Sequence, residues 1–168
     1  MSTGDDAAFE EFVQARAGAL LRSAYLLTAD RQAAEDLLQD VLEQMYVRWS
    51  RIRASPEAYA RQALVNRATN RWRWRRRRPE TPLVEGMGAP QPDHADRVAS
   101  HAAVLGVLRA LPARQRAVVV LRYLEDRPEA EIAQLLGCSV GTVKSHSARG
   151  LARLRAVLVP VSPDGSIA

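Results

Sequence analysis

The side chains best suited to bind a charged polymer lie between positions 56 and 78, in the sequence PEAYARQALVNRATNRWRWRRRR. Eight arginines fall between Arg61 and Arg78, and no acidic residue follows Glu57 in this stretch. Guanidinium groups neutralise phosphates, while the interspersed Tyr, Trp and Asn side chains can stack on exposed bases or hydrogen-bond to them. The stretch therefore indicates binding to a nucleic acid whose bases are accessible.

Two other interpretations of this stretch remain open. Runs of like charge are often only a solvated face, and a helix rich in Trp and Arg can lie on an anionic membrane surface. At helical spacing Arg61 shares one side with Leu64 and Ala68, whereas Tyr59 and Asn66 fall on the other side. The apolar side is modest and the opposite flank is not uniformly apolar, which disfavours the membrane interpretation.

A second group of hydrogen-bonding side chains lies in residues 129–155, EAEIAQLLGCSVGTVKSHSARGLARLR. Its apolar spacing predicts a short helix, a turn at Gly137 and a longer helix capped by Ser139, which together make a helix-turn-helix. Val140, Val143 and Leu151 are expected to face inward. The N-terminal half of the second helix in this motif enters the DNA major groove, where polar side chains contact bases and phosphates. The side chains expected to point outward there are Lys144, Ser145, His146 and Arg149.

A ridge of carboxylates lies nearer the N-terminus. Asp36, Asp40 and Glu43 follow one another at spacings of four and three, so they share one face of a predicted helix, with Gln39 and Gln44 nearby. Such a ridge is either a solubilising face or a docking surface for a basic partner, and both interpretations remain open.

The charge of the whole chain is divided in the same way. Residues 1–47 contain nine acids and three arginines, whereas residues 48–78 contain eleven arginines and one acid. Residues 79–108 are acidic, and residues 109–168 are basic again. This division indicates two partners, one basic and one polyanionic.

The residue types exclude several classes of function. The sequence has no glycine-rich phosphate loop and no cluster of metal ligands, and its three histidines are isolated at positions 94, 101 and 146. We therefore expect no enzyme, no cofactor, no metal and no small-molecule substrate. Cys138 is the single cysteine, which excludes an internal disulfide. Without an apolar signal core or an apolar run of about 20 residues, the expected location is the cytoplasm.

The elements that must position these side chains are predicted to be helices. Apolar residues repeat at helical spacing, and aromatics make up only 5% of the chain, which favours an all-α fold. Asp30 and Ser55 are suited to cap the second and third helices. The first domain is expected over residues 1–78. Its helices are predicted over about 6–28, 31–49 and 56–78, with a short basic loop over 50–55.

A linker and a second small helical domain are expected to follow. Residues 79–97 are acidic and contain proline and glycine, so they should form a flexible linker. The second domain is expected over residues 98–160. It should contain one helix stopped by Pro112, a second that runs from Pro112 to Leu124, and the helix-turn-helix.

Three long stretches resemble a known family in the expected order. They are AYLLTADRQAAEDLLQDVLEQMYVRW, then PEAYARQALVNRATNRWR, then ALPARQRAVVVLRYLEDRPEAEIAQLLGCSVGTVKSHSARGLARLR. Together they resemble the short bacterial sigma factors of the extracytoplasmic-function group (group IV), and most of all its actinobacterial SigE-like subgroup. The resemblance implies a sigma-2 three-helix bundle and a sigma-4 helix-turn-helix domain. It also implies an alternative-type sigma factor that binds core RNA polymerase and directs initiation at specific promoters.

The resemblance further implies partners and residue roles. In that family the second helix grips the clamp helices of the large polymerase subunit, and the following loop and helix read and open the −10 element. The helix-turn-helix reads the −35 element, and an anti-sigma factor usually holds the protein inactive. Matched residue by residue, this implies polymerase docking by Asp36, Gln39, Asp40 and Glu43, −10 recognition and melting by Arg51, Arg53, Ser55, Tyr59, Arg61, Asn66 and Arg67, and −35 recognition by Lys144, Ser145, His146 and Arg149.

Two positions depart from the family pattern. Arg127-Pro128 replaces the usual apolar-hydroxyl pair before the helix-turn-helix, and His146 stands where arginine is common. A stand-alone helix-turn-helix transcriptional regulator, with the first domain as a dimerisation or sensing module, remains the alternative function. The two promoter elements lie roughly 70 Å apart. The linker reaches at most about 60 Å, so we expect the free protein to be compact or mobile and to open on binding polymerase.

Overall fold

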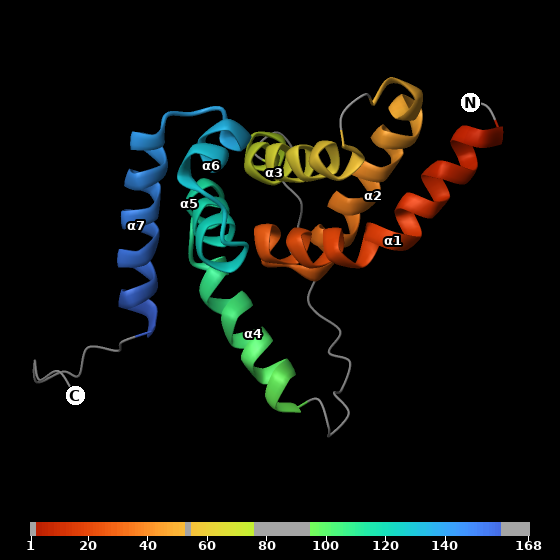
Figure 1. Cartoon of the computed structure of the whole chain (residues 1–168). Coiled ribbons are helices and arrows are strands. Elements are labelled where there is room, and N and C mark those ends of the chain that lie inside the picture. The colour runs from red at the N-terminus through yellow and green to blue at the C-terminus, as the bar shows by residue number, and fades with distance from the viewer. Residues whose placement is uncertain (1–2, 53–54, 76–94, 159–168) are drawn as a thin grey trace, which may run out of the picture.

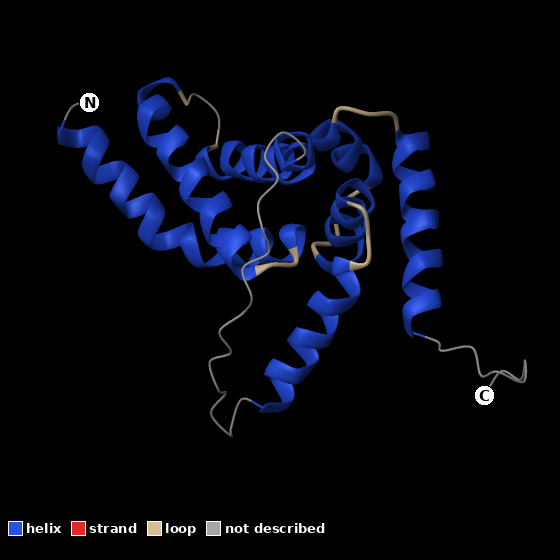
Figure 2. Cartoon of the chain, turned by 180° about the vertical axis from the view of Figure 1, so that it is seen from behind, coloured by secondary structure: helices blue, strands red, loops and turns tan. Residues whose placement is uncertain are grey.

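The computed structural model describes residues 3–52, 55–75 and 95–158. Figure 1 shows the order of the helices in this part of the chain, and Figure 2 shows helices and loops but no strand. The predicted all-α fold is therefore confirmed. The elements are α1 (Thr3–Thr28), α2 (Arg31–Arg48), the 3₁₀ turn η1 (Trp49–Arg51), α3 (Pro56–Arg75), α4 (Ala95–Arg109), α5 (Ala113–Val119), the π turn η3 (Val120–Leu124), α6 (Glu129–Leu136) and α7 (Val140–Leu158).

Capping side chains determine where the helices of the first half begin. Asp30 has an extended backbone before α2, and its Oδ1 accepts a hydrogen bond from the Ala33 N–H at 2.7 Å. The Ser55 Oγ accepts a longer bond, 3.4 Å, from the Ala58 N–H at the start of α3. Both predicted caps are confirmed, since each oxygen satisfies an N–H of the first turn that has no partner within its helix.

The basic loop predicted over 50–55 is partly helical. α2 passes directly into η1, in which the Ile52 N–H donates to the Trp49 carbonyl at 3.1 Å. A 3₁₀ turn commonly tightens the end of an α-helix, and apolar periodicity cannot reveal it in so short a segment. Arg51 therefore lies in a turn of fixed geometry, and Arg53 lies outside the described residues.

The helices α1, α2 and α3 pack together around an apolar core (Figure 1). α1 starts earlier than the expected residue 6, and the predicted continuation of α3 over 76–78 lies outside the described residues. The apolar residues on the inner face of α2 are buried, except Leu42, which is half-buried, as is Trp49 of η1. The Trp49 ring meets Phe9 edge-on, with ring centroids 5.1 Å apart. The buried apolar residues of these three helices are Leu20, Ala24, Leu27, Ala33, Ala34, Leu37, Leu38, Val41, Met45, Ala60, Leu64, Val65 and Ala68.

The second half starts earlier than the sequence predicted. α4 begins at Ala95, inside the segment 79–97 that was expected to be a linker, whereas the second domain was expected from residue 98. No proline or glycine follows Pro92 in that segment, so nothing in the backbone prevents the helix from extending ahead of its first apolar residue. Residues 76–94 lie outside the described part.

The helix-turn-helix forms as predicted. Gly137 ends α6 with a positive φ of 61°, a conformation that glycine adopts at little cost. The Ser139 Oγ then accepts a hydrogen bond from the Thr142 N–H at 3.1 Å and caps α7. The start of α6 has no side-chain cap, because Pro128 stands there. Instead, the negative charges of Glu129 and Glu131 in its first turn interact favourably with the positive end of the helix dipole.

α7 packs closely on α5. Val143, Ser147 and Gly150 are the buried residues of α7, and a Cβ built on Gly150 would lie 2.8 Å from Val119 Cγ2. The absence of a side chain at Gly150 therefore lets the two helices approach. The prediction that Val140 faces inward is wrong, since it is exposed in the first turn, which projects beyond the contact with α5.

The two halves also pack against each other. α3 contacts α5 and α6, and α1 contacts α4 and α5, so the buried apolar residues of both halves form one continuous cluster (Figure 1). The two halves are therefore closed against each other. This arrangement corresponds to the compact one of the two states, compact or mobile, expected for the free protein. In the described ranges, no helix combines the length and apolarity needed to cross a membrane.

Candidate nucleic-acid interface

The start of α7 presents an exposed polar face. Lys144, Ser145 and Arg149 are exposed, on the side of α7 away from Val143 and its contact with α5. The Lys144 side chain is 65% exposed, and its Nζ lies 3.9 Å from a Glu129 carboxylate oxygen. So exposed and long an ion pair holds the ammonium weakly. Three of the four residues predicted for −35 recognition thus lie together and are free to reach a groove.

His146, the fourth, differs from this prediction. It is half-buried, and its Nδ1 is buried without a hydrogen-bond partner in the described part of the chain. Burial lowers the pKa of His146, and the positive charges of Arg114 and Arg149 lower it further. The ring is therefore neutral at pH 7. Sequence spacing put His146 on the outer face, but the ring is half-buried and close enough to Arg114 of α5 to feel its charge.

This environment predicts a pH dependence of stability. The unfolded chain binds a proton at His146 near its ordinary pKa of 6.5, whereas the folded chain binds it only at lower pH. The unfolded state thus holds more protons in this window, so stability should fall as the pH drops below about 6.5. The difference between wild type and His146→Gln in urea unfolding, measured at pH 7.5 and 5.5, isolates this contribution. An equal change with pH in both proteins would contradict it.

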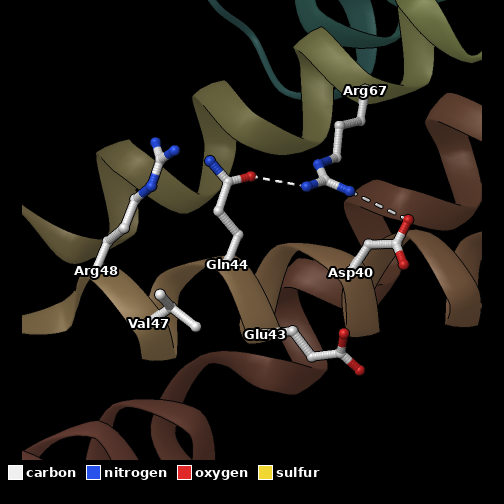
Figure 3. A pocket seen from close by; sticks show the side chains of 6 residues that line it. All are labelled: Asp40, Glu43, Gln44, Val47, Arg48 and Arg67. Atoms are coloured by element: carbon white, nitrogen blue, oxygen red, sulfur yellow. Dashed lines mark hydrogen bonds and ion pairs between the residues drawn. The ribbon is translucent and has the colours of Figure 1, made fainter. Parts of the chain in front are cut away.

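The outer side of α3 is joined to α2 by hydrogen bonds. The Tyr59 hydroxyl accepts a bond from Gln44 Nε2 at 3.0 Å, and Arg67 donates to Gln44 Oε1 at 2.8 Å. Arg67 also pairs with Asp40 at 3.2 Å (Figure 3). Asp40, Gln44 and Arg67 border an open hollow of about 350 Å³ that Val47 and Arg48 also line. Gln44 therefore holds the two side chains in place, a role that spacing alone did not reveal.

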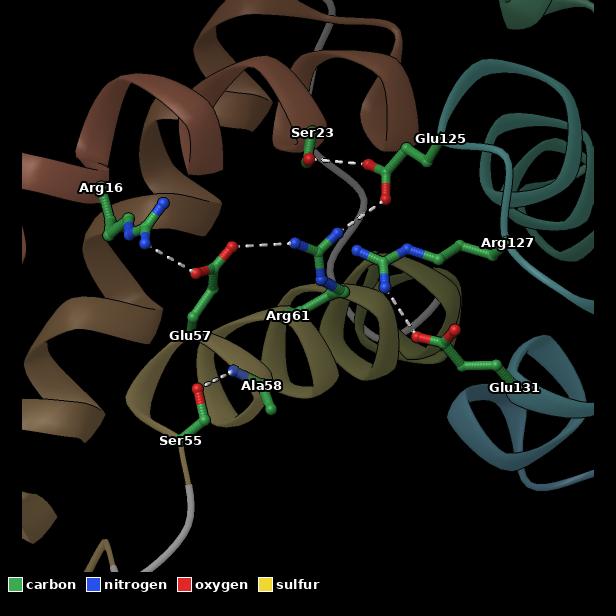
Figure 4. A network of polar contacts seen from close by, with 9 residues as sticks. All are labelled: Arg16, Ser23, Ser55, Glu57, Ala58, Arg61, Glu125, Arg127 and Glu131. Carbon is green, nitrogen blue, oxygen red and sulfur yellow. Dashed lines mark hydrogen bonds and ion pairs between the residues drawn. The ribbon is translucent and has the colours of Figure 1, made fainter.

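The remaining side chains predicted for −10 recognition are distributed unevenly. Arg51 and Asn66 are exposed, and Ser55 is exposed while it caps α3. Arg61 lies on the inner side of α3, as its spacing predicted, and its side chain is only 19% exposed. Its guanidinium pairs with Glu57 at 3.2 Å and with Glu125, from the second half, at 2.9 Å (Figure 4). In this closed arrangement the Arg61 guanidinium is therefore paired with carboxylates of the protein and is not available to a phosphate.

The acidic ridge of α2 is exposed as predicted. Asp36, Gln39, Asp40 and Glu43 all reach solvent, and Gln39 Nε2 donates to Glu43 at 3.0 Å. Beside the ridge lies an open groove of about 500 Å³ between α1 and α2. Apolar spacing does not reveal such a groove, because it cannot distinguish a side chain that lines a groove from one that is buried in the core. The groove is lined by Phe9, Leu21, Glu35, Leu38, Gln39, Leu42, Glu43 and Tyr46.

The described residues form three exposed surfaces that are suited to binding. No group of three or more His, Cys, Asp or Glu residues that could hold a metal ion occurs within the described ranges. What the geometry brings together is one exposed acidic ridge with an apolar groove, and two surfaces with cationic donors on different helices.

Comparison with protein families matches both halves of the chain. Residues 4–78 match the family model described as Sigma-70 region 2, and residues 101–154 match the model described as Sigma-70, region 4. Over 158 residues, the chain is 42% identical to the RNA polymerase sigma-E factor of Streptomyces coelicolor, with 93% of this chain and 89% of that protein covered. It is 32% identical to the ECF RNA polymerase sigma factor SigM of Mycobacterium tuberculosis, with 92% of this chain and 79% of that protein covered.

Solved structures show the same fold at lower identity. The sigma factor RpoE of Bartonella quintana, solved in complex with the anti-sigma factor NepR, matches with a TM-score of 0.63 and 24% identity. That match covers 90% of this chain and 96% of the solved chain. CnrH in complex with the cytosolic domain of CnrY matches with a TM-score of 0.63 and 23% identity, covering 94% of this chain and 91% of that one.

Proposed function

Because the chain belongs to the extracytoplasmic-function sigma factors of bacterial RNA polymerase, of the actinobacterial SigE-like type, we propose that its two cationic surfaces read the two elements of one promoter. It is an alternative sigma factor that binds core RNA polymerase and directs transcription initiation, not a stand-alone regulator. The observation that carries the proposal is the exposed donor face at the start of α7, on a different helical group from the donors of α2 and α3.

The −35 element is assigned to α7. Lys144 and Arg149 can donate to guanine or phosphate, and Ser145 can hydrogen-bond to either. His146 is neutral and half-buried, so it contributes through shape and through its outward ring atoms rather than through charge. We therefore expect a preference for −35 sequence that differs from that of relatives with arginine at this position.

The −10 element is assigned to the surface where α2, η1 and α3 meet. Single-stranded bases stacked on aromatic rings contribute about 1–3 kcal/mol each. Capture of the open strand shifts the duplex equilibrium, so strand opening needs no catalytic group. We therefore propose an initiation factor without catalytic activity of its own. The residues assigned to this surface are Arg51, Arg53, Ser55, Tyr59, Arg61, Asn66 and Arg67.

Docking to core polymerase is assigned to the acidic ridge together with the apolar groove beside it. Apolar side chains bordered by Gln39 and Glu43 suit a helix that carries both apolar and basic residues. This geometry favours the docking interpretation of the ridge over the solubilising one. The proposed division of the chain is docking and −10 recognition over 1–78, a linker over 79–97, and −35 recognition over 98–160.

The partners and location proposed are those of the family. They are core polymerase, promoter DNA and an anti-sigma factor, and the expected location is the cytoplasm, where polymerase meets the chromosome. The solved sigma factor RpoE of Bartonella quintana, which has the same fold, is in complex with an anti-sigma factor.

Transcription in vitro tests the function directly. Core polymerase with the purified chain should initiate at promoters that core enzyme alone does not use. In a gel shift, the chain should bind duplex promoter weakly alone and specifically with core enzyme. Failure both to associate with core enzyme and to support initiation at any new site would overturn the proposal.

Neutralising the ridge should weaken docking. The triple variant Asp36→Asn, Asp40→Asn and Glu43→Gln keeps side-chain size but removes three charges. Exposed charge pairs contribute up to about 1 kcal/mol each, so the affinity for core enzyme should fall by about 1–3 kcal/mol, and the fall should shrink at high salt. Titration of labelled protein with core enzyme measures the change.

The control for that variant removes the same charge elsewhere. Glu10→Gln, Glu11→Gln and Asp126→Asn lie away from the ridge, and asparagine tolerates the positive φ at position 126. This control should bind as wild type does. Equal losses in the two triple variants would return the ridge to the solubilising interpretation.

A further inference from the structure

The contact between the two halves has a buried carboxylate at its centre. Glu125 follows η3 in the second half, and its side chain is only 12% exposed. One of its oxygens accepts a hydrogen bond from the Ser23 hydroxyl of α1 at 2.7 Å, and the other pairs with Arg61 of α3 at 2.9 Å (Figure 4). Both oxygens of Glu125 are thus engaged by the first half.

Further polar contacts link the two halves. α1 has no basic residue in its last turn, and two arginines of the second half donate to carbonyls at its end and just beyond it. Arg116 Nη1 donates to the Thr28 carbonyl at 2.6 Å, and Arg109 Nε donates to the Ala29 carbonyl at 2.6 Å. Gln62 of α3 donates in the opposite direction, to the Leu135 carbonyl of α6, at 2.8 Å. With the continuous apolar cluster, these contacts hold the closed arrangement.

The closed arrangement is incompatible with reading a whole promoter. α3 packs on α5 and α5 packs on α7, so the axes of α3 and α7 are separated by two helix-packing distances, about 20 Å. The two promoter elements lie about two helical turns, roughly 70 Å, apart. The halves must therefore separate before both elements can be bound. Separation removes the Glu125 partner of Arg61 and leaves only the pair with Glu57 of the same helix, from which a phosphate can more easily take the guanidinium.

We propose that Glu125 is the latch of an autoinhibited state: it occupies Arg61 in place of a nucleic-acid phosphate and holds α4–α7 against α1–α3 until polymerase separates them. The inference rests on the proposed function, because it concerns the availability of the −10 surface. A carboxylate and a phosphate offer a guanidinium the same paired oxygen acceptors, so the two compete for it. Closure reduces the apparent affinity for nucleic acid by the fraction of molecules that are open.

The latch is tested with Glu125→Ala in the full chain. Small-angle scattering should give a larger radius of gyration than for wild type. Fluorescence anisotropy with a labelled single-stranded oligonucleotide at low salt, without polymerase, should show binding about tenfold tighter. Arg61→Gln should also enlarge the radius, but it should gain no affinity, because the released guanidinium is missing.

The matched control is Glu131→Ala. Glu131 carries the same charge in the same half, but it pairs with Arg127 of its own half at 2.8 Å (Figure 4). This control should keep the wild-type radius and should gain affinity only to the small extent that one lost negative charge allows. If Glu125→Ala matches Glu131→Ala in both measurements, the latch is excluded. If circular dichroism shows that Glu125→Ala has unfolded, Glu125→Gln takes its place, because glutamine keeps the side-chain size and one acceptor. Its radius of gyration and affinity are then compared with those of Glu131→Ala.

Transcription by the wild-type chain is the separate readout for the proposed function. Its absence with core enzyme would overturn the function, whatever the scattering shows. A wild-type chain that transcribes, beside a Glu125→Ala chain with unchanged radius and unchanged affinity, would overturn the latch alone.

Discussion

A chain with alanine at both Lys144 and Arg149 should lose most of its discrimination at the −35 element. Each contact to a base contributes about 1–3 kcal/mol to binding. Lys144 and Arg149 are separated along α7, so each can make its own contact. The holoenzyme should therefore bind its promoter about 2–6 kcal/mol less tightly if the contributions add. A −35 sequence altered at the contacted base pairs should no longer weaken binding further.

The measurement is holoenzyme affinity for promoters with native and altered −35 sequences, at fixed salt. Arg155→Ala is the matched control, because it removes the same charge from the exposed far end of α7. It should reduce affinity slightly and equally for both promoters. If the double variant also loses affinity equally for both, the two side chains contact phosphate only. If it transcribes as wild type does, the assignment of α7 to the −35 element is wrong.

Replacing Leu64 with alanine should destabilise the fold by about 2–5 kcal/mol. Leu64 is 1% exposed and belongs to the apolar cluster that runs through both halves. Its removal leaves a cavity among side chains that helices on several sides hold in place, so little collapse can fill it. The loss is a large share of the about 5–15 kcal/mol by which domains are usually stable.

Urea unfolding followed by circular dichroism measures this loss. Val47→Ala removes apolar volume from a side chain that is 79% exposed, and it should change stability by no more than about 0.5 kcal/mol. Similar midpoints for the two variants would contradict the burial of Leu64. A change in the slope of the transition, with the midpoint unchanged, would instead indicate that the two halves unfold separately.

Much of the fold follows from local sequence signals. Asp30, Ser55, Gly137 and Ser139 act on their own neighbours, so their positions predicted where helices start and end. The short 3₁₀ and π turns did not follow, because they depend on how a helix end is packed. The early start of α4 at Ala95 shows the same limit, since a helix can begin ahead of its first large apolar residue without a sequence signal.

The site was predictable by residue type and less so by exposure. Lys144 and Arg149 project as their spacing predicted, because α7 packs against α4, α5 and α6 with its other side. Spacing placed His146 outward, but the ring is half-buried near α5. Spacing placed Arg61 on the inner side of α3, but it did not reveal the pair with Glu125 that limits its exposure. Such contacts join residues far apart in the chain, and helical periodicity contains no information about them. The residue roles remain predictions until the variants above are measured.

The hydrogen bonds from the second half to the C-terminal end of α1 affect how fragments of this protein behave. Arg116 donates to the Leu27 and Thr28 carbonyls at the end of α1, and Arg109 donates to the Ala29 carbonyl that follows. A fragment that stops before α4 leaves these three carbonyls to water. The final turn of α1 should fray, and the neighbouring wall of the bundle should loosen with it. Affinities measured on such a truncated fragment would describe a softened surface, and they would understate what the intact chain can hold.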